Sequence, residues 1–100
     1  MSAAVTFTDE SGLYLNGVLD HQTGARLRKE GQTLIKNAPA KALVVNCAAV
    51  TRSSSVGLSL LLCYIRDAEA LNRSLSIRAL PEDLRKIAEV SGLTELLVHH

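Results

Sequence analysis

With 100 residues, the chain is long enough for one domain and too short for a second one with its own core, so we expect residues 1–100 to form a single domain. Hydrophobic residues make up 47% of the sequence, with one Phe, two Tyr and no Trp, which predicts an aliphatic core. The net charge of +1 gives no electrostatic reason for binding nucleic acid or an anionic membrane surface.

The first third of the chain predicts two strands followed by a helix. Val5 and Phe7 alternate with polar neighbours, and a second alternating stretch, residues 13–18, follows a Ser-Gly pair; this pattern is typical of a hairpin. From Asp20 onward the apolar residues take near-helical spacing. Asp20 or Thr23 can cap the first turn of that helix.

The remaining two thirds predict alternating strands and helices. Residues 42–50 (ALVVNCAAV) carry apolar side chains on both faces, which predicts a central strand covered on both sides. An apolar helix over about Ser55 to Leu71, a strand over residues 74–80, a helix that Gly92 ends and a last turn over Leu93 to Leu97 follow. The predicted fold class is α/β, a small mixed sheet of about four strands with three to four helices in the order β-β-α-β-α-β-α-α.

Several classes of protein lack support in this sequence. No basic segment followed by an apolar stretch opens the chain, and the longest apolar run is about half of a membrane span, so we expect a soluble cytoplasmic protein. Cys47 and Cys63 lie in apolar runs, which favours reduced buried thiols over a disulfide, and no metal-ligand spacing surrounds them. His99 and His100 fit either native residues or the remainder of a purification tag and receive no role.

Three consecutive serines, Ser53 to Ser55, precede Gly57 at the start of the apolar helix. A nucleophilic serine needs a positioned base and oxyanion donors, and no acid is placed to orient His21; a phosphate-binding loop needs more glycines and a lysine. We therefore expect no enzymatic activity, no catalytic residue, no cofactor and no metal. Two interpretations stay open: Ser54 or Ser55 only caps the helix, or the exposed hydroxyls dock a partner or accept a phosphate.

Three separated segments carry a resemblance that covers nearly the whole chain. They are GVLDHQTG at residues 17–24, LVVNCAAVTRSSSVGLSLLL at residues 43–62 and SIRALPEDLRKIAEVSGLTELL at residues 76–97. Together, in this order and spacing, they resemble the STAS domain family (sulfate transporter and anti-sigma factor antagonist). The second segment is similar to the family's buried strand, its D-[ST]-[ST]-G-L hinge and the helix that follows.

The hinge departs from the family pattern at two positions. In anti-sigma factor antagonists the residue immediately before the hinge glycine is the serine that a partner kinase phosphorylates, and that position is Val56 here. The aspartate of the motif is replaced by Ser54. Ser55 matches the middle position and is the candidate for phosphorylation in place of the missing serine.

Stand-alone STAS proteins without the phosphoacceptor include cytoplasmic subunits of an ABC transporter that moves phospholipids and maintains outer-membrane lipid asymmetry. The resemblance to them implies a non-catalytic accessory subunit that binds the transporter's ATPase on the cytoplasmic side of the inner membrane, in a complex with permease and lipid-binding subunits. The alternative is an anti-sigma factor antagonist that binds an anti-sigma kinase in a phosphorylation-controlled switch, and a ligand-sensing or lipid-binding STAS module is a third interpretation.

The expected partner-binding residues come from the ends of two predicted strands and the start of the apolar helix. Since both strands end at the same edge of the sheet, we expect one shared surface, with the last three residues of the set on the outward side of the helix. The set comprises Asp20, His21, Thr23, Arg52, Ser53, Ser54, Ser55, Val56, Ser59 and Leu60.

Overall fold

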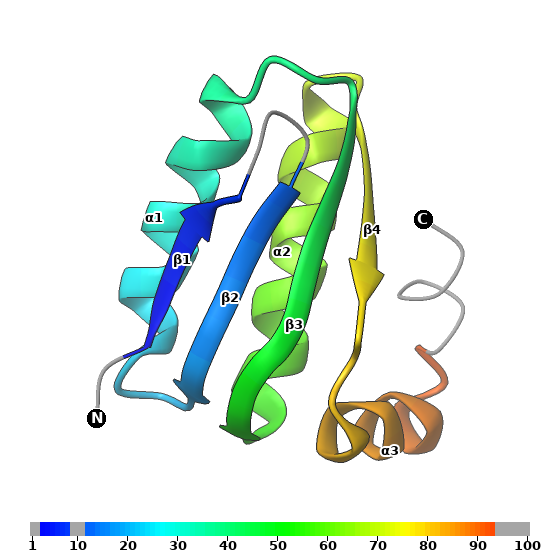
Figure 1. Ribbon diagram of the computed structural model, residues 1–100. Helices are drawn as coiled ribbons and strands as arrows, with labels where there is room; N and C mark the ends of the chain where they lie inside the picture. Colours follow the sequence, from blue (N-terminus) through cyan, green and yellow to red (C-terminus); the bar gives the residue numbers. More distant parts are fainter. Residues whose placement is uncertain (1–2, 9–11, 94–100) are drawn as a thin grey trace.

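The computed structural model describes residues 3–8 and 12–93 and contains four strands and three helices in the order β-β-α-β-α-β-α (Figure 1). In chain order they are β1 (Ala4–Phe7), β2 (Gly12–Leu19), α1 (Gly24–Asn37), β3 (Ala42–Ser53), α2 (Ser55–Ala70), β4 (Ser74–Arg78) and α3 (Glu82–Ser91). The predicted α/β class and element order are confirmed. The expected last turn over Leu93 to Leu97 lies outside the described residues, apart from Leu93.

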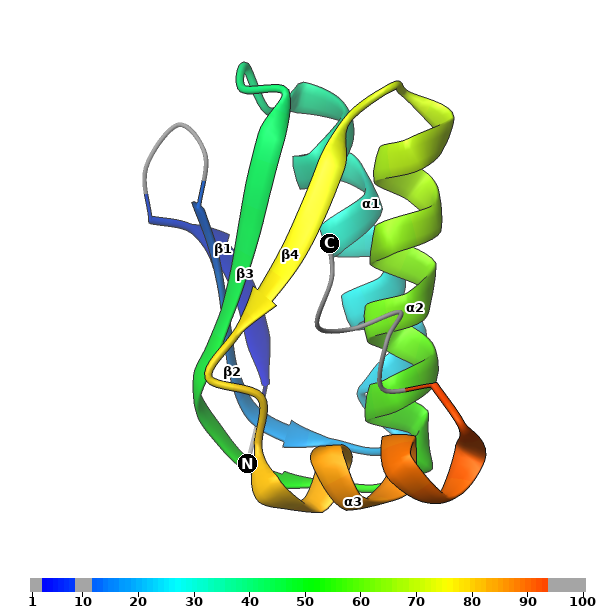
Figure 2. The same cartoon turned by 90° about the vertical axis from the view of Figure 1, so that its right-hand side faces the viewer.

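The strands form one mixed sheet in the order β1-β2-β3-β4. β1 and β2 pair antiparallel as the predicted hairpin, while β2 with β3 and β3 with β4 pair parallel. The two crossovers advance across the sheet in the same direction, and right-handed connections therefore place α1 and α2 on the same face. Figure 2 shows both helices on that face and α3 at the end of the sheet where β3 finishes.

The central strand β3 is covered on one face only by the described residues, so the expectation of a strand covered on both sides is wrong for this part of the chain. Leu43, Val45 and Cys47 point toward the helices and are buried, whereas the alternate residues Val44 and Asn46 are half-buried. Apolar residues occur on both faces of the strand, but both crossover helices lie on the same side. Sequence composition did not reveal that choice of side.

α1 and α2 pack closely where Gly31 faces Tyr64. A Cβ added at Gly31 would lie 2.2 Å from the Tyr64 ring, so a side chain there cannot be accommodated without movement. The Tyr64 hydroxyl donates a hydrogen bond to the Leu27 carbonyl oxygen, with an oxygen–oxygen distance of 2.6 Å. Glycine weakens an isolated helix by about 1 kcal/mol relative to alanine, and the close helix contact explains why it is used here.

α3 ends at Gly92, as the sequence predicted. Glu82 and Asp83 occupy its first turn, where negative charge is favourable, and Gly92 ends it with a positive φ of 71°. Leu84 and Ala88 are its buried residues. Within residues 3–8 and 12–93, no helix has the length and apolar character needed to cross a membrane.

Candidate functional site

The serine segment, defined here as residues 52–57, joins β3 to α2 and carries the N-cap of the helix. Ser54 takes an extended backbone conformation, and its side-chain oxygen accepts a hydrogen bond from the Val56 N–H at 3.2 Å. This bond satisfies one of the free N–H groups at the start of α2. Ser54 is therefore the cap, one of the two predicted candidates. Ser55, the first residue of the helix, is exposed.

Gly57 lies in a crowded part of the serine segment. A Cβ at this position would lie 2.0 Å from the Ser53 Oγ and 3.2 Å from both Leu19 Cδ1 and Leu84 Cδ2. The first turn of α2 therefore sits directly against the end of β2 and against α3. This close packing fixes the orientation of the N-terminus of α2, and with it the positions of Ser54 and Ser55.

The end of β2 lies beside the serine segment, as the sequence predicted for a shared sheet edge. Leu19 pairs with Ser53 in the β2–β3 register, and the Ser54 N–H donates to the Leu19 carbonyl oxygen at 3.0 Å. The chain then turns through Asp20, whose Oδ1 accepts hydrogen bonds from the N–H groups of Gln22 at 2.9 Å and Thr23 at 3.1 Å.

The Asp20 turn also engages the side chain of Thr23. The Thr23 hydroxyl accepts a hydrogen bond from the Asp20 N–H at 3.1 Å and donates one to the Val18 carbonyl oxygen at 2.9 Å. Thr23 is the N-cap of α1, but its side chain makes no cap hydrogen bond to that helix. Asp20 and Thr23 therefore shape the turn that holds His21, and His21 itself is exposed.

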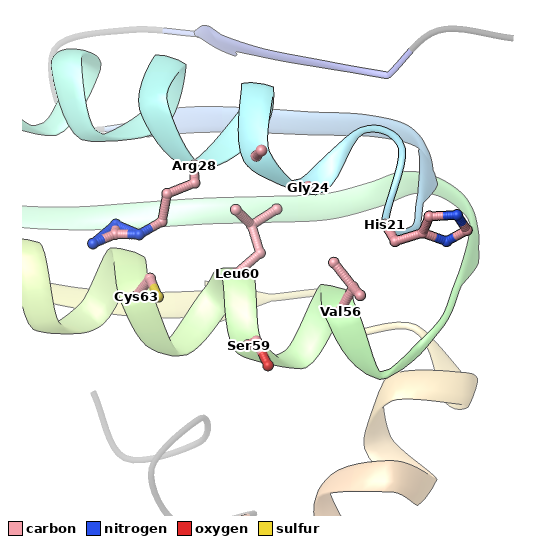
Figure 3. A pocket seen from close by; sticks show the side chains of 8 residues that line it. His21, Gly24, Arg28, Val56, Ser59, Leu60 and Cys63 are labelled. Carbon is pink, nitrogen blue, oxygen red and sulfur yellow. The ribbon is translucent and has the colours of Figure 1, made fainter.

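A groove of about 380 Å³ runs between the first halves of α1 and α2, and we call it the α1–α2 groove (Figure 3). His21 lies at its end beside the β2–α1 turn, Val56 and Leu60 point into it from α2, and Arg28 and Cys63 lie further along. The complete lining is His21, Gly24, Ala25, Arg28, Val56, Ser59, Leu60 and Cys63. Four predicted partner-binding residues are thus brought together here: His21, Val56, Ser59 and Leu60.

Comparisons with known proteins identify the family of this chain and solved structures with a similar fold. The family model described as "Mlab, STAS domain" matches residues 3–99. The chain belongs to the STAS domain family. Two similar solved structures are the anti-sigma factor antagonist SpoIIAA in its unphosphorylated form (TM-score 0.74, 20% identity, covering 97% of this chain and 86% of that chain) and the Bacillus cell fate determinant SpoIIAA in the phosphorylated form (TM-score 0.68, 21% identity, covering 97% and 89%). No curated protein matches the sequence significantly.

The STAS hinge places the predicted site residues in three different environments. Ser54, Ser55, Ser59 and Arg52 are exposed, while Ser53 and Val56 are half-buried. Leu60 is only 3% exposed, so the expectation that it faces outward is wrong. Since it follows Val56 by one helical turn on the side facing α1, Leu60 forms the floor of the α1–α2 groove.

Sequence reasoning missed the residues that α1 contributes to this STAS groove. Ala25 and Arg28 follow His21 at helical spacing, which was the available signal for one face. The Arg28 guanidinium forms an ion pair with Asp67 of α2, which lies one helical turn beyond Cys63, with a nitrogen–oxygen distance of 3.0 Å. Cys63, two turns after Val56, was expected to be buried but is half-buried and lines the groove.

The site combines apolar surface in the groove with exposed hydroxyl groups beside it. Within the described ranges, no group of three or more His, Cys, Asp or Glu side chains could hold a metal ion. Cys47 and Cys63 are both free, and burial raises the pKa of the Cys47 thiol to about 12, which keeps it protonated and unreactive. The groove offers an apolar floor between helices, with small hydroxyl-bearing side chains beside it.

Proposed function

We propose that this STAS protein is a non-catalytic accessory subunit that binds the ABC ATPase of a phospholipid transporter and supports its assembly and activity. The observation that carries the proposal is the environment of Val56, the residue immediately before the hinge glycine. It has no hydroxyl, it is half-buried, and it lines the α1–α2 groove. The position that carries the phosphate in anti-sigma factor antagonists is therefore an apolar contact here.

The contact between Val56 and α1 makes this position part of the packing between the helices. A Cβ added at Gly24 would lie 2.7 Å from Val56 Cγ1, so the two helices approach each other closely at this point. A permanently apolar position suits an interface that is always present, whereas a phosphorylation switch requires a hydroxyl that a kinase can reach. The match to the "Mlab, STAS domain" model supports the same assignment, since MlaB is the STAS subunit of the Mla phospholipid transporter.

The surrounding surface fits a partner polypeptide. Ser54, Ser55 and Ser59 are small and exposed, so they allow close approach of another backbone and offer hydroxyls for hydrogen bonds. The adjacent groove provides an apolar cleft in which a partner side chain can be desolvated, as the centres of protein interfaces do. In this assignment the partner is an MlaF-like ATPase, bound on the cytoplasmic face of a complex with permease and lipid-binding subunits.

Co-purification with the ATPase tests the proposal. We expect Ser55→Arg to weaken binding at least about tenfold, because a long charged side chain would stand at the contact. Ser74→Arg is the matched control, since Ser74 is also exposed but pairs with Ala42 at the start of β3, the end of that strand opposite to the serine segment. Recovery of no ABC ATPase with the functional wild-type chain, or equal recovery with both variants, would contradict the proposal.

Cys63 provides a second readout that needs no substitution. It lines the α1–α2 groove and is half-buried, so a maleimide should label it in the free protein. Binding of the ATPase should slow this labelling, whereas an unchanged labelling rate in the purified complex would mean that the groove stays open.

A partner switch with an anti-sigma kinase is the second candidate function, and the exposure of Ser55 favours it. A phosphate on Ser55 would add about 1.5 to 2 negative charges at the start of α2, in the middle of the proposed contact. Incubation with ATP and the cognate kinase would then add one phosphate, about 80 Da, to Ser55 and abolish binding. If the protein from cells carries no phosphate at this residue, this candidate is ruled out.

A further inference from the structure

The outer edge of β1 is a second candidate binding surface, because it carries backbone groups that no other described strand pairs with. β1 lies at one end of the sheet order and pairs only with β2, so one side of its backbone has no strand partner among the described residues (Figure 1). Backbone groups of successive residues in an antiparallel strand point alternately toward the partner strand and away from it. Which residues point outward can be worked out from two hydrogen bonds at the ends of the strand.

Both hydrogen bonds indicate the same alternation of inward and outward backbone groups along β1. The Thr8 N–H donates to the Gly12 carbonyl oxygen at 2.9 Å, so the even-numbered residues face β2. The Ala3 carbonyl oxygen accepts instead from the Arg26 guanidinium of α1, so the odd-numbered residues face the open edge. Val5 and Phe7 therefore direct their N–H and C=O groups away from the sheet.

A groove of about 610 Å³ lies along this edge, between β1 and the side of α1 that faces away from α2, and we call it the β1–α1 groove. Val5 and Leu34 contribute apolar surface to it, and Thr33 a hydroxyl. Arg26 is paired with Glu30 at 3.0 Å, while Lys29 is exposed and has no ion-pair partner within residues 3–8 and 12–93. None of the residues that line the β1–α1 groove also lines the α1–α2 groove.

We propose that the β1–α1 groove is a binding site for an extended segment of a partner polypeptide, which adds to β1 as a fifth strand. A residue paired with Val5 would exchange both backbone hydrogen bonds with it and direct its side chain to the helix side of the sheet, against Leu34. Residues two positions away along the segment point to the same side, near Lys29. The site therefore selects an aliphatic residue followed or preceded at that spacing by an acidic one.

A second copy of this chain fits the same edge poorly. β1 has only four residues, and symmetric pairing would bring together two grooves that, in the described part of the chain, each carry one uncompensated positive charge, Lys29, since Arg26 is paired with Glu30. Like charges facing each other oppose association. The Lys29 ammonium, unpaired among the described residues, instead favours a segment with an acidic side chain.

A capped seven-residue peptide tests the proposal, with leucine at its centre, glutamate two positions before and after it, and threonine elsewhere. We expect its addition to the ¹⁵N-labelled chain to give saturable shifts at the amides of Val5 and Phe7, with a Kd below about 1 mM. N-methylation of the central leucine should weaken binding about tenfold, because it removes one edge hydrogen bond. Replacing both glutamates by glutamine should weaken it by up to about fivefold.

Two variants at one position separate the backbone from the side chain. Phe7→Pro removes an outward N–H and no bond to β2, whereas Phe7→Ala keeps that N–H; the side chain is 41% exposed, so both variants should fold. We expect the peptide to bind the alanine variant and to lose at least about fivefold in affinity for the proline variant.

The outcomes that would overturn the proposal are equally specific. They are an absence of saturable shifts at these amides up to about 2 mM peptide, equal binding of the N-methylated peptide, or shifts centred on the α1–α2 groove. A dimer of the free chain in sedimentation velocity that Phe7→Pro dissociates would assign the edge to self-association instead.

Discussion

Substitution of Gly57 by alanine tests the packing that fixes the direction of the serine segment. The new Cβ would lie 2.0 Å from the Ser53 Oγ, so the serine side chain must rotate and give up its hydrogen bond to the Ser54 carbonyl oxygen, now 2.8 Å long. The Cβ would also lie 3.2 Å from one methyl carbon each of Leu19 and Leu84, and these must yield by a few tenths of an ångström.

The size of the effect follows from opposing contributions. Overpacking costs about 1–3 kcal/mol, while alanine gains about 1 kcal/mol over glycine in a helix. Gly57→Ala should therefore lower the free energy of unfolding by about 1 kcal/mol, with a range of about 0–2 kcal/mol. In a Ser53→Ala background the closest contact is absent, so the same substitution should be nearly neutral. The expected coupling between the two positions is about 1 kcal/mol.

Urea denaturation of the four proteins in this double-mutant cycle, followed by far-UV circular dichroism, measures the coupling. Similar m-values across the cycle would show that the comparison concerns the folded state. If Gly57→Ala destabilises the protein equally with and without the Ser53 hydroxyl, then the two side chains do not meet and the described geometry of the serine segment is wrong.

Three further predictions concern the core and the two cysteines. Tyr64→Phe removes the buried hydrogen bond to the Leu27 carbonyl oxygen and should lower the free energy of unfolding by about 1–2 kcal/mol in the same urea assay; no change would mean that the bond contributes nothing. Burial raises the pKa of the Cys47 thiol from 9.0 to about 12, so this thiol ionises at lower pH in the unfolded chain than in the folded protein. The free energy of unfolding should therefore be unaffected by Cys47 below pH 9 and fall above pH 9 by up to about 1.4 kcal/mol per pH unit. Cys47→Ala should remove this contribution to the pH dependence. At pH 8 a thiol reagent should label Cys63 in the folded protein and Cys47 only after unfolding, and equal labelling rates would contradict the described burial.

The local features of this fold could be predicted from the sequence because they depend on neighbouring residues. The hairpin alternation, the cap at Ser54 and the stop at Gly92 each follow from residues within one or two turns of the chain. The shared edge of the site was also predictable, since parallel strands end at the same side of a sheet. The Leu19–Ser53 pairing confirms that expectation.

Features that depend on contacts between distant segments could not be predicted. The apolar pattern of β3 is compatible with helices on either side, and only the order of the strands places α1 and α2 together. Leu60 lies toward α1 because of how the two helices cross, which the helical period of α2 alone does not give. The Arg28–Asp67 ion pair joins residues 39 positions apart, so the α1 side of the groove had no signal beyond its spacing from His21.

α1 separates the two surfaces described above. One side of the helix forms the α1–α2 groove beside the serine segment, and the other forms the β1–α1 groove along the open sheet edge. Because the grooves share no lining residue, variants such as Ser55→Arg and Phe7→Pro can test them independently. Loss of ATPase binding with the first and its retention with the second would show that the two surfaces act separately.

Hydrogen–deuterium exchange of the purified complex with the ABC ATPase tests the central claim most directly. We expect the start of α2, residues 55–60, to become more protected when the ATPase is bound, while β4 exchanges as in the free protein. Unchanged exchange at residues 55–60 in a stable complex, with new protection elsewhere on the chain, would contradict the claim.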